Sequence, residues 1–427
     1  MPNLNDEAWE AFWSNGDFSS RLENEGFFEV DARDLKPFRE PRLMAKFDHL
    51  AQMPILFREN QIGILPISNS RYRVGFFNTF TQTPQNLSLQ RIKTMRLPEE
   101  LETLQIGDIG SEAAAINAAL ASGVIQDFVG DAVVPTQFGR QRSGNFKFSI
   151  PSSRQFGAQS LEVKGAQIEI DAGLESGDGF YLVEAKRYLP DDFNARQLYY
   201  PFRTWEARIS KTVTPIFLSF TNDVYTLVQY QVESIEDYSS MTPTKVGRYS
   251  LSDVSLEKDD LVLLLERPPL ESVQGVPFPQ ADDFDKVLSL VEYLSSSDAS
   301  AEQIAHHFGV DIRQSDYYFN AARYFGWVDV SIGDSGRYRH ASLEGSRLST
   351  ASPKERNFEV AEKMLSISTL RWAFSYWVKC GVRPSKDEML SVFIQSKEAE
   401  SISGETLSRR VRTISSWLDW LLSLVGK

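Results

Sequence analysis

Two strand-like patterns follow each other near the middle of the chain. Polar and β-branched residues alternate over residues 166–172, which indicates a strand with one buried face. Residues 174–179 have the glycine, serine and acidic composition of a turn, and residues 180–183 form a short apolar run typical of a strand covered on both faces. The pattern therefore predicts two neighbouring strands joined by a tight connection.

The second of these strands becomes ionic where it ends, at Glu184 and Lys186. Side chains two positions apart on a strand share a face, so these two point the same way. The turn brings Asp171, at the end of the first strand, next to them. We expect two carboxylates and an ammonium group to converge there, although the same residues also occur by chance as a surface ion pair at a strand end.

This set of groups suits a hard divalent cation. Mg²⁺ binds one or two carboxylates, keeps several waters and contacts phosphate oxygens. The ion lowers the pKa of a bound water and offsets charge on a phosphoryl group, and a nearby lysine can hold the attacking water or the phosphate. The residues thus predict hydrolysis of a phosphate ester with Mg²⁺ as the cofactor.

A family resemblance supports this interpretation. Ile170 and Asp171, the turn, and Val183-Glu184-Ala185-Lys186 resemble the core of the PD-(D/E)xK nucleases, with Ile170 where that family usually has proline. Residues 197–203 (QLYYPFR) and the apolar residues 213–220 resemble a group of type II restriction endonucleases.

The resemblance implies an α/β (α+β) nuclease core, in which helices flank a mixed sheet. Asp171 and Glu184 would bind Mg²⁺ together with the backbone carbonyl of Ala185. Lys186 would position the attacking water or stabilise charge at the phosphate. Gln197 would lie near the active centre, while a packing or hydrogen-bonding role for it is equally open. Cleavage of double-stranded DNA would leave 5′-phosphate and 3′-hydroxyl ends.

Residues 111–120 are small and rich in alanine, which predicts a helix with Ser111 as its N-cap. In the resembled fold, a helix before the first core strand often supplies another carboxylate, and Glu112 holds that position. The alternative is a first-turn glutamate favoured by the helix dipole. Glu169 shares a face with Asp171 and either lies near the metal or faces solvent.

Two basic segments are candidates for DNA contact. Residues 62–67 and 72–77 read as strands around a turn, so Arg71 and Arg73 could reach DNA or belong to a structural hairpin. Residues 139–144 read as a basic loop punctuated by glycine, which carries Arg140 and Arg142.

Composition shifts predict five regions. A mixed N-terminal region (1–105) precedes the nuclease core (106–245), whose sheet has about five strands. A linker rich in proline and glycine (246–280) leads to a domain of helices and a hairpin (281–350) and then to a helical region (351–427).

The pattern of residues 281–350 looks like a winged helix. Helices over 287–294, 301–308 and 312–325 precede a basic hairpin at 327–340. In that fold the third helix usually enters the major groove and the wing contacts the backbone, although winged helices also bind proteins. The candidate base-reading residues on the third helix are Arg313, Gln314, Ser315, Tyr317, Asn320 and Arg323. Arg337 and Arg339 would contact phosphate from the wing.

The helix predicted over residues 406–421 resembles the C-terminal helix of the same restriction-enzyme group. Arg409 and Arg410 on it face phosphates in this interpretation. Trp417 and Trp420, three positions apart, are expected to pack rather than to stack on bases.

Composition narrows the classes of protein. The net charge of −13 argues against a protein that coats nucleic acid nonspecifically, but a DNA enzyme needs only a local basic surface. One cysteine excludes an internal disulfide and a cysteine-based zinc site. No apolar run is long enough to span a bilayer and no signal peptide is evident, so we expect a cytoplasmic protein without a membrane partner.

The interpretation favoured by the sequence is a type II restriction endonuclease. We expect double-stranded DNA as its substrate, a homodimer because one site cuts one strand, and a DNA methyltransferase of matching specificity as its functional partner. Two alternatives stay open: a repair or mobile-element nuclease on the same core, and a winged-helix regulator whose nuclease-like domain is inactive.

Overall fold

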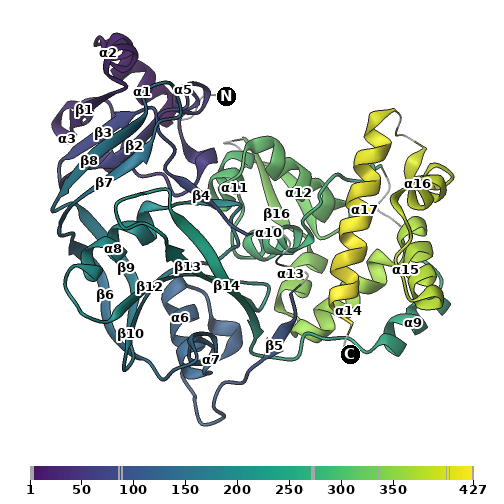
Figure 1. Cartoon of the computed structure of the whole chain (residues 1–427). Coiled ribbons are helices and arrows are strands. Elements are labelled where there is room, and N and C mark those ends of the chain that lie inside the picture. The colour runs from purple at the N-terminus through teal and green to yellow at the C-terminus, as the bar shows by residue number, and fades with distance from the viewer. Residues whose placement is uncertain are drawn as a thin grey trace. The chain divides into compact units, whose positions relative to one another are not determined.

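The computed structural model describes residues 4–84, 87, 90–270, 275–333, 336–400, 402 and 404–425 (Figure 1). Its contacts divide the chain into two compact units. The first comprises Met1–Gln85, Ile109–Ser219 and Thr226–Gly247, and the second comprises Asn86–Asp108, Phe220–Tyr225 and Arg248–Lys427. The fold is mixed α/β, and its largest sheet is flanked by helices.

That sheet has seven strands in the order β5-β14-β13-β12-β10-β9-β6. Their bounds are β5 Ile92–Thr94, β6 Val134–Arg142, β9 Gln167–Glu175, β10 Gly179–Lys186, β12 Thr212–Thr221, β13 Val224–Val232 and β14 Met241–Ser250. Strand β10 pairs antiparallel with β9, where Val183 lies opposite Ala172, and parallel with β12, where Glu184 lies opposite Phe217. The sheet is therefore mixed, and β10 is held on both edges.

The central pair of strands follows the hydrophobic pattern. Ile168 and Ile170 of β9 are each 2 % exposed, and the apolar run of β10 is buried except at Tyr181. Two strands differ from expectation. Residues 139–144 were predicted to be a loop from their basic, glycine-punctuated sequence, but β6 continues to Arg142. The strand is irregular there, with register shifts on either side of Gln137 and a φ of 77° at Gly139. The sheet also has seven strands rather than about five, because β5 and β6 pair at its two ends.

The first unit also contains three helices, α6 (Glu112–Ala121), α7 (Val124–Val129) and α8 (Arg196–Glu206). The Ser111 hydroxyl accepts a hydrogen bond from the Ala114 amide at 3.1 Å, so the predicted N-cap of α6 is confirmed. Helix α6 packs against β9 and β10, whereas α8 packs against β7, β9 and β10 and continues through Pro201.

The N-terminal part of the first unit packs around its own aromatic cluster, which includes Trp9, Phe12, Phe28 and Phe57. Its helices are α1 Leu4–Ser14, α2 Phe18–Glu25, α3 Ala32–Leu35, α4 Pro41–Ala45, η1 Leu50–Gln52 and α5 Ile55–Asn60. Its strands β1 (Phe27–Asp31), β2 (Gly63–Pro66) and β3 (Arg71–Gly75) form an antiparallel sheet in the order β1-β3-β2. The predicted hairpin around residues 68–71 is thus present, with β1 as an additional partner.

Two further strand pairs belong to the first unit. Strand β4 (Phe80–Gln82) pairs with β11 (Asp192–Asn194), and β7 (Asn145–Pro151) pairs with β8 (Ala158–Lys164). The pairing of β4 with β11 joins the N-terminal part to the segment between β10 and α8, the two elements that carry Glu184, Lys186 and Gln197.

The second unit contains the predicted order of helices and hairpin. Its further elements are η3 Ile106–Asp108, α9 Lys258–Glu266, α10 Phe284–Ser296, α11 Ala301–Phe308, α12 Ile312–Tyr324, β15 Val328–Gly333, β16 Gly336–Ala341, α13 Leu343–Thr350, α14 Pro353–Met364, α15 Ser368–Cys380, α16 Lys386–Ile394, η4 Lys397–Ala399 and α17 Glu405–Ser423. Residues 334–335 at the hairpin turn and 271–274 of the predicted linker lie outside the described residues. Trp417 and Trp420 of α17 are 0 % and 6 % exposed, which confirms that they pack inside the unit.

No helix among the described residues is long and apolar enough to cross a membrane.

A buried arginine connects three parts of the first unit. The Arg203 guanidinium on α8 donates to the carbonyls of Lys147 at 3.0 Å and Ile235 at 2.6 Å, and to the Tyr199 hydroxyl at 3.0 Å. It also lies 5.1 Å from the ring centroid of Phe146. Burying a charge is costly unless it is hydrogen-bonded, so these contacts tie α8 to β7 and to the connection after β13.

Replacing Arg203 with methionine should destabilise this part of the fold by roughly 2–4 kcal/mol, because buried carbonyls lose a charged donor. Hydrogen exchange in increasing urea, read by mass spectrometry on peptides from α8 and β7, measures the loss. Arg208→Met is the control, since Arg208 is exposed and donates to a single carbonyl at 3.2 Å. Equal protection in the two variants would contradict the assigned role.

Candidate active site

Asp171 is fixed at the point where the pairing of β9 and β10 ends. The last paired residues are Val183 and Ala172, and beyond them the Ala185 amide donates to Oδ2 of Asp171 at 2.8 Å. The side chain thus takes a backbone donor of the neighbouring strand. This bond sets the carboxylate of Asp171 beside Glu184 and Lys186, as the sequence predicts.

Glu184 and Lys186 form a buried ion pair. Nζ of Lys186 lies 2.7 Å from Oε1 of Glu184, and the two side chains are only 11 % and 8 % exposed. Gln197 Nε2, at the start of α8, donates to the same oxygen at 2.5 Å. The structure therefore brings all four predicted catalytic side chains into one place, from β9, β10 and α8.

Burial and mutual repulsion perturb these groups. Burial raises the pKa of Glu184 to about 7, and the nearby Asp171 adds to the increase. Burial likewise raises the pKa of Asp171, although the Ala185 amide opposes it. Burial acts to lower the pKa of Lys186, but Glu184, Asp48 and Glu112 outweigh it, so that its pKa is raised and the ammonium stays charged. The raised pKa values show that the ionised forms of Asp171 and Glu184 are disfavoured at this site.

Two further carboxylates belong to this electrostatic group. Glu112, at the start of α6, has its pKa raised by burial and by Asp171 and Asp48. Asp48 comes from the segment after α4, where its amide donates to Gln52 at 2.9 Å. Burial alone would raise the pKa of Asp48. The charges of Lys186 and Lys46 outweigh this effect, so the pKa of Asp48 is lowered. Glu112 was a candidate by position, whereas Asp48 was missed.

Asp48 precedes a second interaction network. His49 is fully buried, and its Nδ1 lies 2.7 Å from the carbonyl oxygen of Asp192, while its Nε2 contacts the Tyr188 hydroxyl. The Asp48 carbonyl accepts from the Asn194 amide at 2.9 Å. The segment before η1 is thereby tied to β11. Nothing in the sequence around Asp48 signals this, because the partners lie far along the chain.

The atoms of the site that can bind a metal ion are oxygen atoms. Oδ1 of Asp48 and Oε1 of Gln197 are buried and have no hydrogen-bond partner among the described residues. In the part of the chain that the structure describes, no three His, Cys, Asp or Glu side chains gather closely enough to cage a metal by themselves. Two carboxylates, a carbonyl and waters are the ligand set that Mg²⁺ uses, so Asp171, Glu184 and Ala185 fit this ion.

The arginines of the first unit differ in their availability. Arg71 and Arg73 both pair with Glu29, at 2.5 and 2.6 Å, and Arg73 lies 4.0 Å from the ring centroid of Phe27. These contacts favour the structural-hairpin interpretation. Arg140 is 57 % exposed and lies 3.4 Å from Glu169. Arg142 is exposed at the end of β6.

The candidates on α12 do not all face solvent. Arg313, Asn320 and Arg323 are exposed, and Gln314 and Tyr317 are half-buried. Ser315 is an exception that corrects the sequence prediction. It is 0 % exposed and donates to the Ile312 carbonyl at 2.8 Å, so it is not available to read DNA.

Of the remaining candidate arginines, two are exposed and two have interaction partners. Arg337 and Arg409 are exposed. Arg339 pairs with Asp316 and lies 4.3 Å from the ring centroid of Phe319, so it holds the hairpin to α12. Arg410 is half-buried and donates to Gln280 at 3.4 Å.

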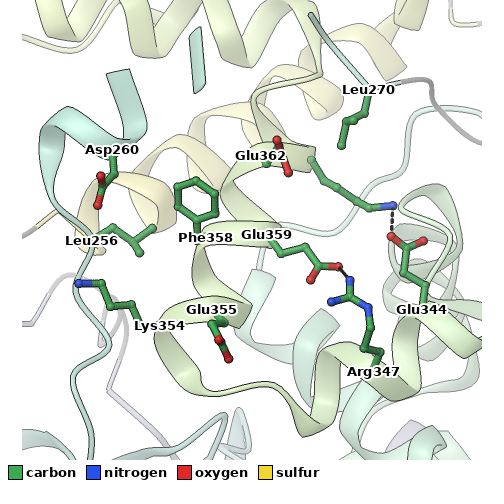
Figure 2. Close-up of a pocket in the computed structure, with 11 residues that line it drawn as sticks. Leu256, Asp260, Leu270, Glu344, Arg347, Lys354, Glu355, Phe358, Glu359 and Glu362 are labelled. Atoms are coloured by element: carbon green, nitrogen blue, oxygen red, sulfur yellow. Dashed lines mark hydrogen bonds and ion pairs between the residues drawn. The ribbon is translucent and has the colours of Figure 1, made fainter. Parts of the chain in front are cut away.

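A cavity of about 550 Å³ lies in the second unit, between α9, α13 and α14 (Figure 2). Its lining residues are Leu256, Asp260, Leu270, Glu344, Arg347, Lys354, Glu355, Phe358, Glu359, Glu362 and Lys363. Four of its charged lining residues pair with each other: Arg347 with Glu359, and Lys363 with Glu344 at 2.8 Å. The lining residues belong to the second unit, whereas Asp171 and the groups around it belong to the first.

Comparisons with known proteins divide the chain into three matched segments, each described as a domain of unknown function. Residues 6–74 match DUF6996, residues 75–250 match DUF6997 and residues 286–426 match DUF7226. No curated protein and no solved structure matches the chain. Asp171, Glu184, Lys186 and Gln197 fall in the second segment and Asp48 in the first, so the candidate site draws on two families that carry no assigned function.

Proposed function

We propose that this protein is a Mg²⁺-dependent, site-specific endonuclease for double-stranded DNA, of the type II restriction kind, built on a PD-(D/E)xK core. The observation that carries the proposal is the joint placement of Asp171, Glu184 and Lys186. Two adjacent strands hold them, and the Ala185 amide fixes Asp171 at 2.8 Å. Carboxylates that can hold a metal ion beside a charged lysine suit metal-assisted phosphate hydrolysis.

Each residue has a role that its contacts support. Asp171, Glu184 and the carbonyl of Ala185 would hold Mg²⁺, which when bound lowers the pKa of a water and offsets phosphoryl charge. Lys186 stays protonated and would orient the attacking water or the scissile phosphate. Gln197 positions Glu184 through its 2.5 Å hydrogen bond.

DNA reading is proposed for the second unit. Arg313, Asn320 and Arg323 are exposed on α12, and Arg337 is exposed on the hairpin β15–β16, as a winged helix would require. The described residues of each chain hold one site of the Asp171, Glu184 and Lys186 kind, so cleavage of both strands calls for two copies of the chain on one DNA. A methyltransferase of matching specificity would protect the host DNA.

Replacing Glu184 with alanine should abolish the discrete fragments that we expect the protein to produce from unmethylated phage DNA with Mg²⁺. The rate should fall by at least about a hundredfold, because charge in the transition state loses its stabilisation. Gel analysis of digests with and without Mg²⁺ measures the loss. Glu175→Ala is the matched control, since Glu175 also lies on a core strand and pairs with a lysine, Lys211, at 2.7 Å.

The wild-type digest decides between the proposal and the regulator alternative. No fragments on unmethylated or methylated DNA, with intact folding and specific binding, would refute the nuclease and leave a winged-helix regulator. Discrete fragments and mapped ends would give the recognition site.

Replacing Gln197 with alanine should raise the Mg²⁺ concentration needed for half-maximal cleavage by about 10–100-fold, because the partner that orients Glu184 is lost. Titration of the cleavage rate with Mg²⁺ measures this. Gln126→Ala is the control: its amide also donates once, to the Leu120 carbonyl at 3.1 Å, and its oxygen is also buried without a partner among the described residues. A lower rate at an unchanged Mg²⁺ midpoint would show that Gln197 only packs.

A further inference from the structure

Three cations surround one carboxylate beside the candidate site. Glu169 of β9 lies 3.4 Å from Nε of Arg140, 3.7 Å from Nζ of Lys46 and 3.8 Å from Nη2 of Arg42. We call these four residues the Glu169 cluster. Arg140 comes from β6, whereas Arg42 and Lys46 come from α4 and the residue after it. The sequence suggested only Arg140 as a DNA contact.

The cluster is loose, open and positively charged. Its side chains are between 36 % and 57 % exposed, and its three pairs are all longer than 3.3 Å. Exposed ion pairs of this kind contribute at most about 1 kcal/mol each, so an incoming anion can replace them at small cost. Within the cluster three cations face a single carboxylate, so the four side chains together carry a net charge of about +2. By contrast, Arg71 and Arg73 are held at 2.5 and 2.6 Å by their own glutamate.

The cluster borders the carboxylates of the candidate site. Glu169 and Asp171 are two positions apart on β9, so their side chains share a face. Burial raises the pKa of Asp171, while Lys46 is close enough to act against the rise. The same lysine acts on Glu112 and Asp48. A polyanion bound at the cluster would therefore lie next to the site.

We propose that Arg42, Lys46 and Arg140 bind the phosphodiester backbone of duplex DNA next to the bond to be cut, and that Glu169 is the internal counter-ion that the phosphates displace. Guanidinium groups bind phosphate through paired hydrogen bonds, and lysine adds a point charge. This inference rests on the proposed function, because it places the DNA at the Asp171 site. It adds a substrate-binding surface that needs no metal.

The test measures DNA binding without catalysis. Fluorescence anisotropy of a labelled duplex in EDTA, at several salt concentrations, gives the affinity and the slope of log K against log salt. In the variant Arg42→Ala/Lys46→Ala/Arg140→Ala, the slope should become shallower by about 0.9 for each lost phosphate contact, and binding should weaken to a similar extent for every sequence.

Glu169→Gln should have the opposite effect and tighten binding, because the competing carboxylate loses its charge. The matched controls are Glu162→Gln and Lys147→Ala/Lys164→Ala on β7–β8. There an exposed glutamate holds two exposed lysines, at 3.8 and 3.0 Å, on a pair of strands outside the seven-stranded sheet. Both controls should bind DNA as the wild type does, and thermal melting should show all variants folded.

The outcomes separate this inference from the nuclease itself. No DNA binding by the wild type, an unchanged salt slope in the triple variant, or weaker binding by Glu169→Gln would each overturn the phosphate cluster. If the variants behave as expected while the wild type never cuts DNA with Mg²⁺, the cluster stands and the nuclease proposal fails. If DNA is cut and the triple variant binds normally, the nuclease stands and the cluster is wrong.

Discussion

The candidate site depends on keeping the ion pair of Glu184 and Lys186 out of water. Removing two charges from water costs several kcal/mol for each, and the Coulombic attraction repays this only when the geometry is good and further hydrogen bonds are made. At the ion pair β12 holds one edge of β10, while on the other edge the Ala185 amide donates to Asp171 at 2.8 Å. Gln197 adds a donor to Glu184 at 2.5 Å. Helices α6 and α8 pack against β9 and β10, and the two side chains are 11 % and 8 % exposed. A cation bound at the same carboxylates would relieve the excess negative charge that burial leaves behind.

Much of the local structure was predictable from the sequence, because it follows from periodicity. Buried residues recur at the strand period in β9 and at the helix period in the second unit. The N-cap at Ser111 follows from its residue type. Ser315 could also have been placed correctly. It is separated from Phe319 by four positions and from Ala322 by seven, so a helix puts all three on one face, and all three are buried. Residue type suggested a hydrogen-bonding role there, but position on the helix decided its burial.

The remainder could not be predicted, because it depends on contacts between distant segments. Asp48 reaches the site through the bond between its carbonyl and the Asn194 amide, and Arg42 and Lys46 through the path of α4. For the arginines, the sequence shows the charge but not the partner. Arg203 became part of a core and Arg339 part of a hairpin contact, whereas Arg140 stayed accessible. The segment that was read as a loop is a strand, because pairing with β9 outweighs the irregular pattern of β6.

The border between the first two matched families falls inside a single strand. One family model ends at residue 74 and the next begins at residue 75, while β3 runs from Arg71 to Gly75 between β1 and β2. Both families lie mainly in the same compact unit, and Asp48 on one side of the border shares an electrostatic environment with Lys186 on the other. The bounds of sequence similarity and the bounds of folding therefore differ here. A fragment cut at this border would divide β3 and separate Asp48 from Lys186.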